Sequence, residues 1–285
     1  MSRVHKLHRW QWLWLIPAAL LVWWPLWFLF MGALMSKEEL RLTIGPALGL
    51  GTGYTVWHLL PDWPTLEPLL TLLLDTPQFF VMFWNSIGQS VAQVAGNLLV
   101  GAPAAWAMSR LRFRGRSLVR GLYIVLMLLP FQVTMVPSYL ILRQFGLLDT
   151  PWAIILPGIF STFPVFIMER GFDTVPREVL ESASIDGANQ WQRFWRIGIA
   201  LGIPCLKSAQ RLGFLDGWNA IEQPMTFLES PQYWPLSLFF TDPANLDTKQ
   251  LGLAMAASLW MLLPSILAFR FGQTYLAAGL TKGAG

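Results

Sequence analysis

Charged residues are scarce in this chain. Only 13% of its 285 residues are Asp, Glu, Lys or Arg, whereas soluble domains carry about 25%. Hydrophobic residues make up 54%. One water-soluble core cannot hide so much apolar surface, so the composition indicates an integral membrane protein.

Residues for covalent, metal or nucleotide chemistry are also few. Cys205 is the single cysteine, which excludes a disulfide within the chain. The three histidines (His5, His8 and His58) and the scattered carboxylates show no metal-ligand or nucleophile–base spacing, so we expect no catalytic residue and no metal site. The pattern G-x-x-x-x-G-K-[ST] does not occur, so we expect no phosphate-cradling loop for nucleotide in this chain.

Long apolar runs predict membrane-spanning helices, each of which needs about 20 residues. The run at 12–35 is too long for a secretory signal and no cleavage site follows it, so we expect it to be an uncleaved span. A sixth segment, 204–222, is ambiguous because it contains Lys207, Arg211 and Asp216. The five clear runs are 12–35, 83–108, 121–142, 151–168 and 251–271.

The distribution of basic residues decides how many times the chain crosses. With six spans and both termini in the cytoplasm, 14 of the 20 Lys and Arg residues fall on the cytoplasmic side. Omitting 204–222 would place the weakly basic stretch 223–250 on the arginine-rich side. The positive-inside bias therefore predicts an all-α integral membrane protein with six transmembrane helices and cytoplasmic termini.

Three regions follow from this topology. Residues 1–35 form the N-terminal transmembrane helix, and residues 36–78 form an extracytoplasmic segment. Residues 79–285 form a core of five spans, which includes a long basic cytoplasmic loop at 169–203 and a cytoplasmic tail.

The basic loop predicts a helix–turn–helix on the cytoplasmic surface. Thr174 can cap a helix whose first turn contains Pro176. Gly187 then ends that helix, because glycine adopts the left-handed backbone conformation at little cost. A second amphipathic helix follows, with aromatic side chains at Trp191, Phe194 and Trp195 along one side.

This loop resembles the "EAA" loop of ABC-importer permeases. Residues 181–188 read E-S-A-S-I-D-G-A, and Phe194, Ile197 and Pro204 follow at the family's spacing. Ser182 replaces the usual second-position alanine, and Ala200 replaces a usual proline. Motifs elsewhere, from about Trp84 to the end, are similar to the carbohydrate branch, the maltose-type second permease.

The resemblance implies a permease subunit of a binding-protein-dependent importer in the bacterial inner membrane, which takes up a sugar, oligosaccharide or sugar derivative. The partners that it implies are a second permease subunit, two copies of a cytoplasmic ATPase subunit, an extracytoplasmic solute-binding protein and membrane lipid, with no nucleic acid. The ATPase subunit binds ATP and Mg, and this chain holds no cofactor. It also implies that the 169–203 loop is a coupling loop seated on the ATPase. The expected coupling residues are Glu181, Ser182, Ala183, Asp186, Gly187 and Ala188.

A polar stripe runs along the predicted span at 83–108. Ser86, Gln89, Gln93 and Asn97 recur at steps of three or four residues and so share one helical face. They either line the translocation path or hold helices together, and the sequence does not distinguish the two. Arg211 and Asn219 complete the expected path residues. Arg211 could either pair with a carboxylate of the protein or meet an anionic group on the solute.

Three other classes of protein fit the sequence less well. An ion-coupled carrier would need buried acidic relays or inverted repeats, which are not evident. A membrane enzyme would need a catalytic set within the spans. A structural scaffold would leave the loop motif unexplained.

Overall fold

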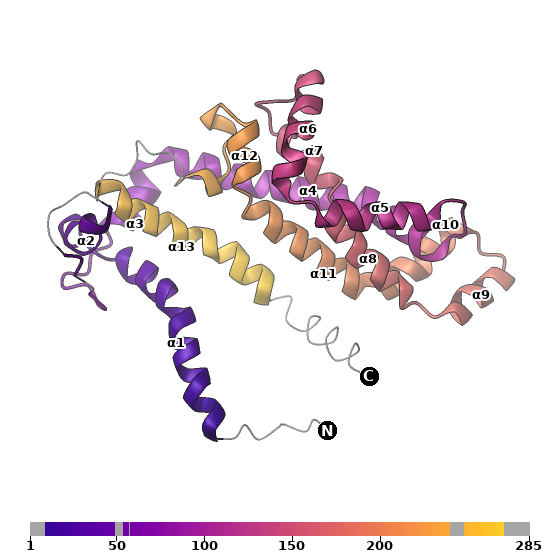
Figure 1. Cartoon of the computed structure of the whole chain (residues 1–285), viewed down its shortest axis with the longest axis horizontal. Helices are drawn as coiled ribbons and strands as arrows, with labels where there is room; N and C mark the ends of the chain where they lie inside the picture. Colours follow the sequence, from indigo (N-terminus) through magenta and orange to yellow (C-terminus); the bar gives the residue numbers. More distant parts are fainter. Residues whose placement is uncertain (1–8, 49–53, 57, 240–247, 271–285) are drawn as a thin grey trace. The chain divides into compact units, whose positions relative to one another are not determined.

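The structure is a computed structural model, and it describes residues 9–48, 54–56, 58–239 and 248–270. Every regular element within these ranges is helical (Figure 1). The α-helices are α1 (Arg9–Gly32), α2 (Lys37–Thr43), α3 (Glu67–Leu70), α4 (Pro77–Arg110), α5 (Arg116–Leu128), α6 (Phe131–Gln144), α7 (Trp152–Ile159), α8 (Thr162–Asp173), α9 (Arg177–Ile185), α10 (Gln190–Gln192), α11 (Ile199–Trp218), α12 (Glu222–Phe227) and α13 (Thr248–Arg270). Short 3₁₀ or π-helical pieces are η1 (Gly45–Leu48), η2 (Thr71–Asp75), η3 (Arg193–Gly198), η4 (Pro231–Tyr233) and η5 (Leu236–Leu238).

Four helical stretches in the described residues are long and apolar enough to cross a membrane: Leu13–Gly32, Pro77–Arg110, Trp152–Asp173 and Leu251–Arg270. They coincide with four of the five clear runs in the sequence. The bent pair α5 and α6 makes a fifth if it is one span. The expected cytoplasmic tail and the N-terminal basic residues Arg3 and Lys6 lie outside the described residues.

The run at 121–142, which hydropathy predicted as one span, is not one continuous helix. The structure divides it into α5 and α6, whose axes differ by 106°. The break occurs at Leu129 and Pro130, whose ψ angles are 127° and 150°. Proline disfavours the helical conformation in the residue before it, so Leu129 is extended and the chain turns sharply.

The ambiguous segment 204–222 is largely helical. It lies mainly within α11, a 20-residue helix with Pro204 in its interior. Lys207, Arg211 and Asp216 keep it out of the stretches that qualify on hydropathy and charge. Helix formation here is therefore confirmed, and a membrane crossing by α11 stays a prediction.

The helices form two compact units. One unit comprises the described parts of Met1–Phe79 and Phe239–Leu263. Its core contains Met31, Met35 and Leu40, against which Leu251 and Met255 of α13 pack. The end of α1, helix α2 and α13 are thus joined by apolar contacts.

The second unit comprises Phe80–Leu238 and the described part of Pro264–Gly285. Its helix α8 contacts both α5 and α11 (Figure 1). Backbones approach closely where α8 meets α11, because a Cβ on Gly171 would lie 2.2 Å from Cβ of Cys205. The lone cysteine therefore acts as a small packing residue, as small residues commonly do between membrane helices.

Candidate functional site: the 169–203 loop and the polar face of α4

The turn after α9 has the geometry that the sequence predicted for Gly187. Its φ angle is +83°, in the left-handed region that favours glycine. The amide of Ala188 donates to the Ala183 carbonyl at 2.9 Å, and the amide of Gly187 donates to the Ser184 carbonyl at 3.1 Å. These two bonds form a Schellman motif, which satisfies carbonyls that the helix end would otherwise leave unpaired.

The second helix of the loop starts with a reciprocal cap. The backbone amide of Gln192 donates to Oδ1 of Asn189 at 2.8 Å, and the backbone amide of Asn189 donates to Oε1 of Gln192 at 2.9 Å. The chain then continues through the π-helix η3 into α11. Both sides of the turn at Gly187 are therefore closed by local hydrogen bonds, which define its shape.

The expected cap at Thr174 is wrong. Pro176 is the N-cap of α9, and no side chain bonds to the helix there. The hydroxyl of Thr174 instead donates to the carbonyl of Gly171 at 2.8 Å, so it caps the end of α8. Threonine side chains bond local backbone in either direction, and the short connection between α8 and α9 favours the preceding helix.

Most of the expected coupling residues are available to a partner. The side chains of Glu181, Ser182 and Asp186 are exposed, as is Gly187, while Ala183 and Ala188 are half-buried. Ile185 is 87% exposed, which is unusual for a large apolar side chain unless another surface covers it. The tip of the loop thus offers charged, small and apolar groups together. The coupling role of these residues stays a prediction.

An aromatic cluster joins the loop to the helices behind it. Phe194 of η3 is 2% exposed, and its ring lies 5.8 Å from Trp106 of α4 and 6.2 Å from Phe172 of α8. Trp106 and Phe172 meet edge to face at 5.3 Å. Edge-to-face aromatic pairs add about 0.5–1.5 kcal/mol each beyond their burial. The loop is therefore packed onto α4 and α8. The rings of Trp191 and Trp195 lie 5.5 and 5.2 Å from Phe194, on one side of the helix as predicted, and both stay exposed.

Three arginines near the end of α4 bond to helix ends, a role that the charge count did not reveal. Arg110 donates through Nε to the Phe172 carbonyl at 2.9 Å and through a terminal nitrogen to the Val175 carbonyl. Arg116 donates to the carbonyls of Met108 and Ser109 in the last turn of α4. Arg120 pairs with the buried Glu169 of α8 at 2.5 Å. These arginines satisfy orphan carbonyls and connect the ends of α4 and α8.

A basic cavity of about 610 Å³ opens beside the loop. Glu181 contributes to its wall, and Arg193 has a buried Nε without a hydrogen-bond partner. The arginines lining the cavity are Arg110, Arg112, Arg116, Arg120, Arg177 and Arg193. Six arginines against Asp173 and Glu181 leave this wall basic, and guanidinium groups bind carboxylates in bidentate geometry.

The four polar residues of the α4 stripe are all buried. The Asn97 amide nitrogen donates to the carbonyls of Ile159 and Ser161 at 2.9 and 3.1 Å, at the break between α7 and α8. Gln89 donates to the Tyr233 carbonyl at 2.9 Å, and the Ser86 hydroxyl accepts from the Leu236 amide at 2.7 Å. In this conformation the stripe satisfies backbone groups of irregular segments.

Gln93, the fourth member, fits against two glycines. A Cβ on Gly158 would lie 2.5 Å from Gln93, and a Cβ on Gly217 would lie 2.6 Å from its Oε1. The amide side chain therefore occupies space that only glycine leaves open in α7 and α11. The helix-packing alternative accounts for all four contacts, and a solute-lining role for the stripe stays a prediction.

Arg211 and Asn219, the other two expected path residues, do not share the contacts of the α4 stripe. Arg211 lines a second cavity of about 840 Å³ with Lys207 and Gln210. The rest of that lining is largely apolar and includes Val94, Leu98 and Phe214. Asn219 is exposed, and its amide donates to the Leu215 carbonyl at 2.8 Å, which ends α11.

Asp149 is a connecting residue that the sequence analysis did not single out. Its Oδ1 accepts from the amides of Glu229 and Ser230 at 2.9 and 2.7 Å, and its own amide donates to the Phe227 carbonyl at 2.9 Å. Bonds from the Ser230 hydroxyl and amide lower the pKa of the Asp149 carboxyl. Asp149 has a positive φ of 53°, which aspartate tolerates better than most residues.

Residues 97–282 match the family described as binding-protein-dependent transport system inner membrane component. The chain belongs to this family. The resemblance that the 181–188 motif carried is thereby confirmed: the protein is a permease component of a binding-protein-dependent ABC importer of the inner membrane.

Individual relatives agree with the family. The inner membrane ABC transporter permease protein YcjP of Escherichia coli is 30% identical over 230 residues, which cover 79% of this chain and 81% of the relative. The arabinooligosaccharides transport system permease protein AraQ of Halalkalibacterium halodurans is 26% identical over 78% of this chain and 80% of its own. A chain in a crystal structure of a bacterial ABC transporter involved in the import of the acidic polysaccharide alginate superposes with a TM-score of 0.75 at 24% identity, covering 92% of this chain and 94% of that chain. That likeness supports the permease fold.

Proposed function

We propose that this permease imports a sugar, an oligosaccharide or a sugar derivative, with ATP hydrolysed by a partner subunit. The support is the family together with relatives named for saccharide transport, such as AraQ. Buried amide and hydroxyl groups on α4 are the kind of groups that hydrogen-bond hydroxylated solutes when helices separate.

The proposed topology has six spans with both termini in the cytoplasm. Besides the four clear apolar helices, it counts the bent pair α5 and α6 as one span and α11 as another. This arrangement places the 169–203 loop and the arginines of the 110–120 segment on the cytoplasmic side. Residues 36–78 then lie outside.

The observation that carries the proposed mechanism is the shape of the loop at Gly187. Its tip is exposed and closed by a Schellman motif, while its base is packed onto α4 and α8 through Phe194. A rigid element of this kind transmits displacement, because its two ends cannot move independently. When two ATPase subunits close on ATP and Mg, the loop would tilt the helices to which it is packed.

The proposed assembly contains a second permease, two ATPase copies and an extracytoplasmic solute-binding protein. The arginine-lined cavity favours an ATPase surface that presents carboxylates, whereas the exposed carboxylates of Glu181 and Asp186 at the loop tip favour basic groups opposite them. This chain supplies no cofactor of its own in the proposal.

Lys207 and Arg211 favour a more specific form of this proposal, in which the transported solute carries an anionic group. Both line the cavity of about 840 Å³ beside α4, and cations within a span commonly mark a solute or ion pathway. Uptake of an acidic saccharide should then fall in Arg211→Ala while uptake of a neutral one persists. Equal rates for the acidic saccharide in both proteins would exclude this version.

Assembly and transport can be tested together. The chain is co-expressed with its candidate ATPase and second permease, purified through a tag on this chain, and reconstituted into proteoliposomes with the solute-binding protein. We expect the ATPase to copurify and labelled saccharide to accumulate only with internal ATP. Uptake without any ATPase subunit would contradict the proposal.

Orientation needs its own measurement. In a Cys205→Ser background, Tyr54→Cys and Asp186→Cys each introduce one exposed thiol, since Tyr54 is 96% exposed. A membrane-impermeant maleimide should label the first in intact spheroplasts and the second only in inverted vesicles. Labelling of Asp186→Cys from outside would overturn the topology and the coupling role together.

A further inference from the structure

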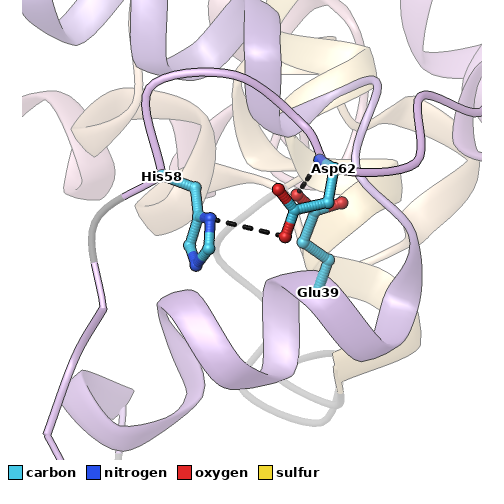
Figure 2. A group of neighbouring side chains, drawn as sticks. All are labelled: Glu39, His58 and Asp62. Atoms are coloured by element: carbon cyan, nitrogen blue, oxygen red, sulfur yellow. Dashed lines mark hydrogen bonds and ion pairs between the residues drawn. The ribbon is translucent and has the colours of Figure 1, made fainter.

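Three side chains in the first unit that are able to bind a metal ion lie together. Glu39 extends from α2, and His58 and Asp62 extend from the loop that follows it, all towards one another (Figure 2). One ligand atom from each residue lies within 4.8 Å of the other two. Neither the coupling loop nor the polar stripe of α4 includes these residues.

The loop that carries His58 and Asp62 is held by backbone contacts. The Trp27 indole of α1 donates to the Leu59 carbonyl at 3.0 Å, and the Thr65 amide donates to the Leu34 carbonyl at 2.8 Å. Between them, the Asp62 amide donates to Oε1 of Glu39 at 2.7 Å. The grouping therefore rests on anchored backbone as well as on side-chain positions.

The spacing of His58 and Asp62 fits two ligands of one ion. Nδ1 of His58 and Oδ2 of Asp62 are 3.6 Å apart, which is longer than a hydrogen bond. Two ligands about 2.0–2.1 Å from a tetrahedral Zn²⁺ lie roughly 3.3–3.4 Å from each other. A small rotation of the Asp62 side chain, which is 63% exposed, brings the pair to that spacing.

A separate observation concerns the carboxylate of Glu39, one member of this group. Oε1 of Glu39 accepts the Asp62 amide, whereas Oε2 is buried and has no hydrogen-bond partner. Buried carboxylate oxygens nearly always have a partner, so an atom of this kind calls for a ligand. A bound cation would satisfy it.

We propose that Glu39, His58 and Asp62 form a binding site for a divalent transition metal of the Zn²⁺ type, with water as a further ligand. The imidazole nitrogen favours such metals over Mg²⁺ or Ca²⁺, which prefer oxygen ligands alone. The ion ties α2 to the 58–62 loop and so stiffens the 36–78 segment. No metal site was expected from the sequence, because ligands at positions 39, 58 and 62 form no short motif.

Metal binding is measured on the full permease complex in detergent. The complex is stripped with chelator and dialysed against buffered Zn²⁺, and bound zinc is counted by mass spectrometry. We expect one more zinc per permease in the wild type than in His58→Ala, and binding at least about tenfold weaker in Glu39→Gln and Asp62→Asn. Glu38→Gln is the matched control, since Glu38 is exposed on the same helix outside the group, and it should bind like the wild type.

Two results would overturn the site. One is the same zinc count and affinity in His58→Ala as in the wild type. The other is an equal loss in Glu38→Gln, which would indicate general attraction to negative charge. ATP hydrolysis by the stripped complexes checks that each variant folds.

The visible absorption spectrum of bound Co²⁺ provides an independent test, which does not depend on comparing the stability of the variants. With Co²⁺ in place of Zn²⁺, the wild-type complex should show the intense visible bands of a four-coordinate site, and His58→Gln should not. A weak, six-coordinate spectrum in the wild type would also reject the proposal.

Discussion

Replacing Gly187 with valine tests the coupling turn most directly. Gly187 has a φ of +83°, and a Cβ added there would meet no heavy atom within 4 Å. The substitution therefore causes no clash with neighbours, and its effect acts through the backbone alone. A left-handed conformation costs a residue with a Cβ about 1–2 kcal/mol, and β-branched side chains are the least tolerant of it.

That cost acts on the shape of the turn. A penalty of 1–2 kcal/mol lowers the population of the closed turn relative to opened forms by a factor of about 5–30. The Schellman bonds at Ala183 and Ser184 would be lost in the opened forms. We expect the solute imported per ATP hydrolysed to fall, by at most that factor, while membrane insertion and basal hydrolysis persist.

The assay is uptake of labelled solute by proteoliposomes, with phosphate release measured in the same samples. Gly146→Val is the matched control, because Gly146 has a φ of +65°, is equally open and lies between α6 and α7, outside the 169–203 loop. Gly187→Asn should recover most of the coupling, since asparagine tolerates the left-handed region. Normal coupling in Gly187→Val, or an equal loss in Gly146→Val, would refute the reasoning.

Three further predictions concern contacts that hold the segments of the second unit together. Asn97→Ala leaves two carbonyls without their donor and should destabilise the folded permease by about 1–3 kcal/mol. An unchanged thermal unfolding temperature would contradict this prediction. Arg120→Leu leaves the Glu169 carboxylate, whose side chain is 3% exposed, without its cation and should cost about 3–5 kcal/mol, whereas adding Glu169→Leu should recover much of the loss. The lowered pKa of Asp149 means that its contribution to stability is complete above the unfolded pKa of about 3.9 and is lost as the pH falls through the lower folded value. An acid unfolding series should show that loss in the wild type and not in Asp149→Ala, and identical curves would contradict it.

Local chemistry made parts of the protein predictable from the sequence. Apolar runs long enough to cross a bilayer identified four spans, because hydropathy over about 20 residues determines that property without reference to neighbours. The left-handed turn at Gly187 was equally predictable, since glycine is the residue that adopts it at little cost. By contrast, the Thr174 hydroxyl bonds to the Gly171 carbonyl of the preceding helix, because threonine can bond local backbone on either side and the sequence does not decide which.

Contacts between distant residues were decided only by the tertiary structure. The sequence showed a polar stripe on α4 and a row of arginines after it, but their partners at Ile159, Tyr233 and Phe172 depend on how helices pack. The same holds for Glu39 and His58, which meet only because the loop is anchored over α2. Periodicity tells which side chains share a face, and the packing of other helices against that face determines what they bind.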